Sequence, residues 1–374
     1  MRWMANIYRL GIKEIFSLLR DPVLMGLIFY TFTFAIYTVA NGVQTEVHNA
    51  SVAIVDEDRS VLSGRITGAF LPPYFKPAER IELPAVDAAM DAGRYTFLLD
   101  IPPGFEADVL AGRQPVLQLN VDATAMTIAG NGTTYITSII NSELLKFIGR
   151  STGTATLPVD LQVRANYNQN LDSSWFMAVM QIINNLTILA IVLSGAAVIR
   201  EREHGTLEHL LVMPVTSSEI MLAKIWANGL VILLAAILSL HLVVQGLLAV
   251  PITGSIPLFA VGAAFYLFAV TAMGITLSTV ATTMPQFGLL SIPVFVVMNL
   301  LSGGLTPLES MPAALQNVVQ ILPSTHFIKF AQAVLYRGAG IDVVWPQLLL
   351  TIGIGGAFFV FGLIRFRATL ASVR

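Results

Sequence analysis

Residues 225–308 read IWANGLVILLAAILSLHLVVQGLLAVPITGSIPLFAVGAAFYLFAVTAMGITLSTVATTMPQFGLLSIPVFVVMNLLSGGLTPL. None of these 84 residues is Asp, Glu, Lys or Arg. The surface of a soluble domain contacts water and carries charge, so such a domain rarely has an uncharged stretch of this length. One crossing of a bilayer takes about 20 apolar residues, which leaves room here for three spans and their connections. The stretch therefore predicts a membrane protein.

The composition of the 374-residue chain agrees, with 55% hydrophobic and 12% charged residues and a mean hydropathy of +0.73. The absence of cysteine excludes disulfides, thiolate metal sites and cysteine nucleophiles. No G-x-x-x-x-G-K-[ST] sequence occurs, so the chain has no P-loop with which to bind a nucleotide. We expect no catalytic residue, metal site or cofactor of its own, and no nucleic-acid partner.

Three further charge-free windows are long enough to cross a bilayer, at 22–45, 173–199 and 343–364. The long stretch divides at 250–257 and again at 282–285, where Pro clusters with Gly or Thr. The sequence thus predicts a membrane α-helical fold with six transmembrane helices. The predicted spans are 22–41, 175–199, 225–250, 257–281, 286–306 and 343–364.

The positions of Lys and Arg near the ends of the spans predict the orientation. Ten lie on the side that holds both termini and two, Lys329 and Arg337, lie on the other side. The ten are Arg2, Arg9, Lys13, Arg20, Arg200, Arg202, Lys224, Arg365, Arg367 and Arg374. Both termini are therefore expected in the cytoplasm. Residues 1–21 form an amphipathic pattern expected in the membrane interface, 365–374 form a cytoplasmic tail, and 22–41 is too long for a cleaved signal peptide.

Residues 42–174 have the composition of a water-soluble domain inserted between the first two spans. Strand patterns alternate with helical ones, which predicts a small mixed α/β domain on the outer side of the membrane. Strands are expected at 51–55, 95–99, 116–121 and 159–163, and helices at 85–92, 105–110 and 135–148. The acidic run at 56–58 fits either a cation site or a solvated turn, and the turn is favoured because Asp and Glu are common in turns.

Residues 200–224 connect the second and third spans on the cytoplasmic side and are the most specific segment of the chain. Gly205 can end the second span in a left-handed conformation, and Thr206 can begin a short helix that Pro214 ends. The sequence T-S-S-E at 216–219 is a capping box that begins the third span. We name residues 200–224 the elbow. Its short amphipathic helix suits a docking site for another protein, or else a position among the lipid headgroups.

The elbow resembles the E-R-E-x-G-T-x-E-x-L-L-x-x-P-x-x-x-x-E-I-x-x-x-K segment of the type-two permeases of ATP-binding-cassette exporters. The residues that fit this pattern are Glu201, Arg202, Glu203, Gly205, Thr206, Glu208, Leu210, Leu211, Pro214, Glu219, Ile220 and Lys224. The similarity covers nearly the whole chain and is greatest to bacterial inner-membrane transport permeases that have a large periplasmic domain. Many members have a Pro-Gly pair at the start of the second span, where this chain reads FMAVMQ at 176–181.

The resemblance implies that the elbow contains the helix that couples the permease to a separate ATPase subunit. ATP and magnesium would bind that subunit, and this chain would not be an enzyme. Six spans are half a transporter, so a homodimer, or a pair with a similar permease, is implied. The location would be the bacterial inner membrane, and a periplasmic adaptor is a further candidate partner.

Polar residues within spans are candidates for function, and here Asn184, Asn185 and Asn299 are candidates for the substrate path or for hydrogen bonds between helices. Residues 307–342 are expected to form interfacial or re-entrant helices at the outer face. An exporter of amphiphilic molecules is the favoured function. An ion-coupled transporter is disfavoured because no span contains an acidic residue. A membrane-anchored sensor or assembly factor that uses the outer domain is the remaining alternative.

Overall fold

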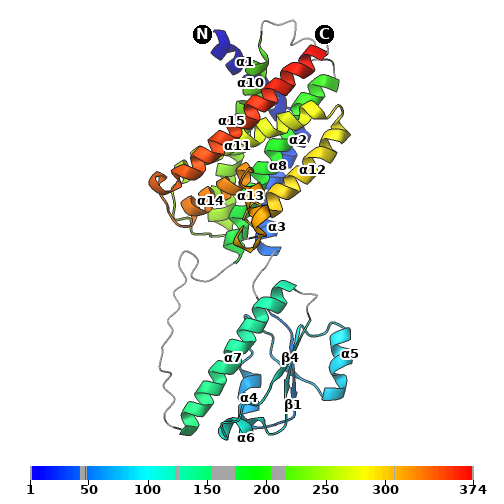
Figure 1. Ribbon diagram of the computed structural model, residues 1–374, viewed down its shortest axis with the longest axis vertical. Coiled ribbons are helices and arrows are strands. Elements are labelled where there is room, and N and C mark those ends of the chain that lie inside the picture. The colour runs from blue at the N-terminus through cyan, green and yellow to red at the C-terminus, as the bar shows by residue number, and fades with distance from the viewer. Residues whose placement is uncertain are drawn as a thin grey trace. The chain divides into compact units, whose positions relative to one another are not determined.

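The computed structural model describes residues 2–42, 47, 49–122, 126–152, 173–203, 205, 215–306 and 308–372. The chain forms two compact units (Figure 1): a helical unit, Met1–Gly42 with Ser174–Arg374, and an α/β unit, Val43–Ser173. The α/β unit has nearly the limits predicted for the inserted domain, 42–174. Its placement on the outer side of the membrane stays a prediction.

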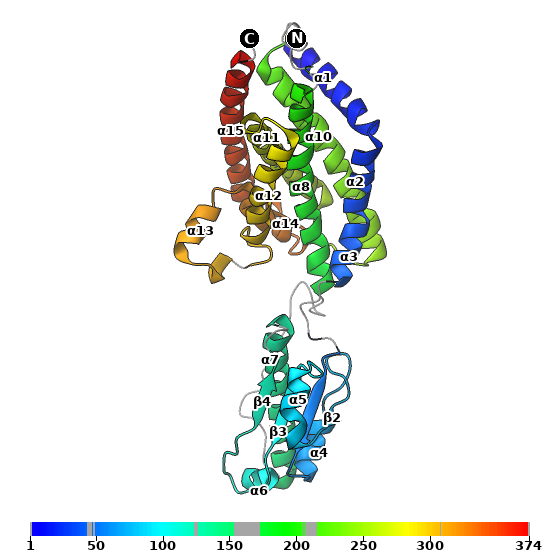
Figure 2. The same cartoon turned by 90° about the vertical axis from the view of Figure 1, so that its right-hand side faces the viewer.

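The described part of the helical unit contains five helices that are long and apolar enough to cross a membrane. They are α2 with α3 (Pro22–Gly42), α8 (Ser173–Glu203), α10 with the π-helix η2 (Ser217–Leu247), α11 (Ile256–Val280) and most of α15 (Ile341–Ser372). α8 is buried along most of its length and is the central helix (Figure 2). The prediction of a helical membrane fold is therefore confirmed.

The predicted count of six spans is not confirmed, because the helix at the fifth predicted span (286–306) is short. This helix, α12 (Met284–Leu300), has 17 residues and a length of about 26 Å, against about 30 Å for the hydrocarbon core. Bends follow at 301–306, where Gly303 has a φ of +88°, a conformation that favours glycine. The apolar pattern of the sequence continues through this break, so the predicted helix is longer than the observed one.

The region predicted to hold outer re-entrant or interfacial helices, 307–342, has three short elements before α15 in its described residues. They are the 3₁₀ turn η3 (Leu308–Ser310), α13 (Ala313–Val319) and α14 (Pro323–Leu335). α14 packs against α11 and α15, and most of its side chains are buried.

The first predicted span (22–41) is broken at Thr33 into α2 (Pro22–Phe32) and α3 (Phe34–Gly42). The backbone of Thr33 has left the helical region, with φ −122° and ψ −78°. Side chains of two other helices donate hydrogen bonds to backbone carbonyls at the break. Asn185 of α8 donates to Thr31 O, and Ser239 of α10 (Ser217–Ser239) donates to Phe32 O. The break is therefore fixed by packing partners that are remote in sequence, and the local apolar pattern does not predict it.

The described residues of the α/β unit form one four-stranded sheet in the order β2-β1-β3-β4. Its strands are β1 (Val52–Asp56), β2 (Glu79–Arg80), β3 (Phe97–Ile101) and β4 (Gln118–Val121). β1 is parallel to β2 and β3, and β4 is antiparallel to β3. The predicted strand 51–55 matches the central β1 within one residue, and 95–99 overlaps the central β3, which begins two residues later. The predicted strand 116–121 contains the edge strand β4, and 159–163 lies outside the described residues. β2 was not predicted, because two exposed charged residues give no strand pattern.

Helices cover both faces of this sheet. α4 (Val61–Gly68), α6 (Phe105–Leu110) and α7 (Met126–Thr152) pack on one face, and η1 with α5 (Leu83–Ala85, Val86–Asp91) lies on the other side. α7 is joined to α4 by an ion pair of 2.7 Å between Glu143 Oε2 and Arg65 Nη2, and Lys146 Nζ lies 2.8 Å from Glu143 Oε1. Hydrogen bonds from Lys146 and Arg65 lower the pKa of the Glu143 carboxyl below its ordinary value.

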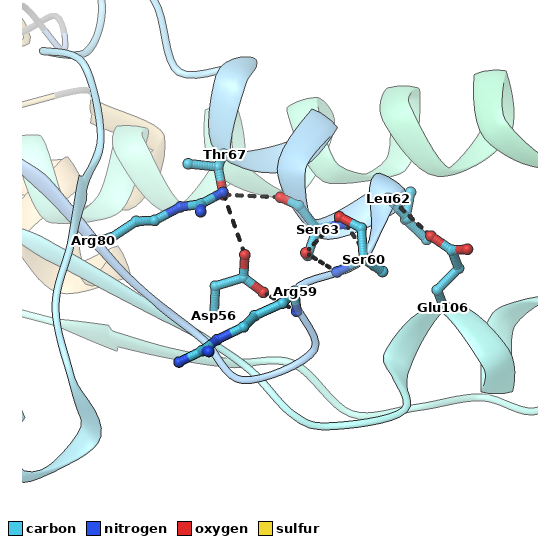
Figure 3. A network of polar contacts seen from close by, with 8 residues as sticks. All are labelled: Asp56, Arg59, Ser60, Leu62, Ser63, Thr67, Arg80 and Glu106. Atoms are coloured by element: carbon cyan, nitrogen blue, oxygen red, sulfur yellow. Dashed lines mark hydrogen bonds and ion pairs between the residues drawn. The ribbon is translucent and has the colours of Figure 1, made fainter.

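The acidic run at 56–58 begins with the last residue of β1, Asp56, and only Glu57 of the run is exposed as expected of a solvated turn (Figure 3). The Asp56 side chain is only 3% exposed, accepts a 2.8 Å hydrogen bond from Arg59 N and lies 3.5 Å from Arg80 Nη2. Glu106 of α6 accepts a hydrogen bond from Leu62 N at the start of α4. These contacts join β1, β2, α4 and α6, and among the described residues no group of three His, Cys, Asp or Glu is arranged to hold a metal.

Candidate functional site

The described part of the elbow begins at the end of α8. α8 ends at Glu203, and Gly205 follows with a φ of +67° and an N–H that donates to Arg202 O at 3.1 Å. The prediction that Gly205 ends this helix in a left-handed conformation is confirmed. Five of the predicted coupling residues, Thr206, Glu208, Leu210, Leu211 and Pro214, lie outside the described residues. Their roles stay predictions.

The elbow leads into α10 through the predicted capping box. Thr216 is the N-cap, and the Glu219 side chain accepts hydrogen bonds from the backbone and the hydroxyl of Thr216. Glu219 also accepts a 3.0 Å hydrogen bond from Asn6 Nδ2 of α1 (Arg2–Leu19). The capping box is therefore confirmed, and its carboxylate additionally ties the start of α10 to the N-terminal helix.

Lys224 lies at the centre of a buried charge cluster formed by α1, α8 and α10. Its side chain is 2% exposed, and its Nζ lies 2.9 Å from Glu201 Oε1 and 3.0 Å from Glu14 Oε1. Lys13 approaches the same Glu201 oxygen to 3.7 Å. A buried ammonium is stable only if it is paired and hydrogen-bonded. The cluster therefore holds the three helices together at this end of the unit.

Two further charges of the elbow bind the turn between α11 and α12. Arg202 Nη1 donates to Ala281 O at 2.7 Å, and Glu203 Oε1 accepts from Met284 N at 3.0 Å. The carbonyl lies at the end of α11 and the N–H at the start of α12, and such terminal groups need partners from outside the helix. The charged end of α8 thus fixes a turn about 80 residues further along the chain.

α8 also contacts the start of the first span. Arg200 Nη1 lies 3.2 Å from Asp21 Oδ2, and Asp21 caps α2 by accepting from Val23 N and Leu24 N. With these contacts, the end of α8 is bonded to α1, α2, α10 and the α11–α12 turn.

The N-terminal helix α1 packs along α10 (Figure 1) and does not lie on lipid alone. Trp226 Nε1 donates to Ile7 O at 3.2 Å, and its ring stacks on Tyr8. A Cβ added to Gly11 would lie 2.1 Å from the Trp226 ring, so only glycine allows this approach. Neither this contact nor the role of Glu14 is predicted by the amphipathic pattern of residues 1–21. The one available signal was that Glu14 is the only acidic residue of an otherwise basic helix.

The three candidate substrate-path asparagines lie on two helices. Asn185 is buried, and it donates to α2 and accepts from Gln181 Nε2 at 3.0 Å. Asn184 is half-buried on α8, and Asn299 is half-buried near the end of α12. In the described part of the chain no hydrogen bond joins Asn299 to the other two. Asn185 therefore has a defined contact between helices, and the substrate path stays a prediction for all three.

Comparison with known proteins gives consistent matches over the whole chain. The profile of the ABC-2 family transporter protein matches residues 15–364. The inner membrane transport permease YhhJ of Escherichia coli (strain K12) is 53% identical over 373 residues, which cover 100% of each chain. The probable multidrug ABC transporter permease YbhR of the same organism is 29% identical over 359 residues, 93% of this chain and 95% of that protein.

Proposed function

The chain belongs to the ABC-2 family of transporter proteins, and on this premise we propose that it is the membrane-spanning subunit of an exporter driven by ATP hydrolysis. In permeases of this family the ATPase is a separate subunit. The chain itself is a multi-pass membrane protein with several apolar helices. Export, as the direction of transport, and ATP hydrolysis as its energy source are the parts of the proposal that go beyond family membership.

The observation that carries the proposal is a set of three contacts made by the charged end of α8, at the start of the elbow. Glu201, Arg202 and Glu203 are consecutive, and they contact Lys224 of α10, the end of α11 and the start of α12 respectively. A displacement of the elbow by a docked protein would therefore move several helix ends together.

The proposed partner at the elbow is an ATP-binding-cassette ATPase, with ATP and Mg²⁺ bound to that subunit. A second permease copy, or a similar permease, would complete the transporter, and a periplasmic adaptor is a further candidate. We place both termini and the elbow in the cytoplasm and the α/β unit in the periplasm, because ten of the basic residues near span ends lie on the side of the termini.

The proposed cargo is an amphiphilic molecule, because the described spans are apolar along their length. Asn184 and Asn299 are half-buried, and they are the preferred candidates for the path. Asn185 is a weaker candidate because its amide already bonds α2.

The test is purification of the full chain from its host membrane under conditions that preserve complexes. A P-loop ATPase is expected to co-purify, and the reconstituted complex is expected to move a fluorescent amphiphile only with hydrolysable ATP. The double variant Glu201→Ala with Glu208→Ala should abolish that movement, whereas Lys329→Ala, an exposed position of α14, should not. If no ATPase co-purifies and the double variant still transports, the proposal is wrong.

A further inference from the structure

A small, partly open cavity of about 190 Å³ lies in the helical unit, lined by residues of α1, α2, α8 and α10. It has a charged part, a polar part and an apolar part. Its lining consists of Lys13, Glu14, Ser17, Leu18, Leu24, Leu193, Ala197, Arg200, Glu201 and Asn228. A wider and more open hollow shares Lys13 and Ser17 with it and extends to the α1–α2 joint.

The amide nitrogen of one residue that lines this cavity makes no hydrogen bond in the described part of the chain. Asn228 is 3% exposed, and its buried Nδ2 makes no hydrogen bond there. A buried amide without a partner costs about 1–3 kcal/mol, so native proteins rarely leave one unsatisfied. The terminal torsion of asparagine is broad, so an acceptor inside the cavity can take the amide protons by a rotation of the side chain. The cavity therefore needs an acceptor that the described residues do not supply.

The charges around the cavity select the kind of acceptor. Two cations, Lys13 and Arg200, and two carboxylates, Glu14 and Glu201, line it. Lys224, which is not part of the lining, pairs with both carboxylates, and Asp21 pairs with Arg200. Because the charges balance, neither a simple anion nor a simple cation finds an excess of opposite charge. A zwitterion finds both: donors for an anionic group and carboxylates for an ammonium group.

The depth of the cavity identifies the source of the zwitterion. α8 has 31 residues and a length of about 46 Å, so a helix of this length centred in the bilayer projects roughly 8 Å beyond each face of a hydrocarbon core of about 30 Å. The cavity residues of α8, from Leu193 to Glu201, lie within about 15 Å of the end of the helix at Glu203. This range covers the headgroup and glycerol levels of one leaflet. Leu18, Leu24 and Leu193 supply the apolar part of the lining at that depth.

We propose that this cavity binds the headgroup of a zwitterionic phospholipid with a primary ammonium, of the phosphatidylethanolamine type. The phosphate accepts from Asn228, Lys13 and Arg200, and the ammonium donates to Glu14. The bound lipid fills the space between α1 and the spans, so it fastens the N-terminal helix to the bundle. This inference concerns the permease chain alone and does not depend on the proposed export.

Native mass spectrometry of the purified full chain tests the proposal, with three lipids that have identical acyl chains. Phosphatidylethanolamine should bind at least about tenfold more tightly than phosphatidylcholine, whose quaternary ammonium cannot donate, and than phosphatidylglycerol, which lacks the ammonium. Equal binding of all three lipids would overturn the proposal and leave a cavity filled by water. If an equal concentration of soluble glycerophosphoethanolamine displaced the lipid, the conclusion that the ligand comes from the membrane would be wrong.

Two variants locate the site. The unfolding temperature of each without lipid is measured first, and its lipid preference is then measured by native mass spectrometry. Asn228→Leu removes the unpartnered amide at similar volume and should lose most of the ethanolamine preference. Thr271→Val, which removes another buried and unpartnered group of the described chain on α11, should keep it. Should Asn228→Leu fail to fold, Lys13→Met serves instead, since Lys13 is 57% exposed, and it should weaken phosphatidylethanolamine binding several-fold. An unchanged preference in the folded variant contradicts the site.

Discussion

Removal of the Lys224 ammonium should destabilise the helical unit strongly, because two carboxylates depend on it. In Lys224→Met the side chain keeps most of its volume, and the charge that lies 2.9 Å from Glu201 and 3.0 Å from Glu14 is lost. These distances place the two carboxylate oxygens at most about 6 Å apart, where two like charges repel by about 3 kcal/mol at an effective dielectric constant of 20. Breaking a buried pair by removing one partner typically costs about 3–5 kcal/mol, and we expect a loss in that range.

The assay is reversible unfolding of the purified full chain in mixed micelles, followed by tryptophan fluorescence. Lys329→Met is the matched control, because it makes the same replacement at an exposed position of α14 and should change the free energy of unfolding by less than about 0.5 kcal/mol. In the double variant Lys224→Met with Glu14→Gln, the repulsion is relieved and part of the loss should return. A Lys224→Met variant as stable as the control would refute the conclusion that the charge cluster holds α1, α8 and α10 together.

Three more perturbations test other contacts. Gly11→Val places a side chain against an indole ring, so α1 should detach and become protease-sensitive, with a loss of at least about 2 kcal/mol, whereas Gly26→Ala, at a position with open space, should be silent. The lowered pKa of Glu143 means that its ion pairs stabilise the fold above the ordinary pKa near 4.5 and lose that contribution as the pH falls through the folded value. Glu143→Gln should therefore unfold more easily at pH 7 and flatten this acid dependence. Asn185→Leu leaves a carbonyl at the α2–α3 break without its partner and should lower stability by about 1–2 kcal/mol in the same unfolding assay; no change would assign Asn185 a role other than packing.

Features set by local sequence were predictable. Gly205 ends α8 because glycine adopts a left-handed conformation at low cost, and the T-S-S-E run begins α10 because the side chains involved are three residues apart. The predicted helix at 105–110 coincides with α6. In each case a few neighbouring residues determine where the helix begins or ends.

Features set by remote partners were not predictable from one sequence. Glu14 and Lys224 are 210 positions apart, and nothing in either local pattern indicates that they meet. The break at Thr33 needs hydrogen bonds from α8 and α10, and the two-residue strand β2 exists because β1 lies beside it. An apolar pattern identifies a span, but the kinks and ends of that span depend on packing, as the short α12 demonstrates.

The internal contacts of the elbow change how its variants must be interpreted. Glu201 was predicted to contact an ATPase, yet its carboxylate lies 2.9 Å from Lys224 within the same chain. A carboxylate accepts several hydrogen bonds, so both roles are compatible, but loss of transport in Glu201→Ala alone would not separate them.

Glu208 provides the comparison, because it lies in the predicted docking helix. We expect Glu201→Ala to lower the unfolding temperature of the isolated chain while the ATPase still co-purifies. Glu208→Ala should leave that temperature unchanged and reduce the amount of ATPase that co-purifies. The opposite pattern, with a stable Glu201→Ala chain that no longer binds the ATPase, would assign Glu201 to the partner surface. It would also show that Lys224 is held by Glu14 alone.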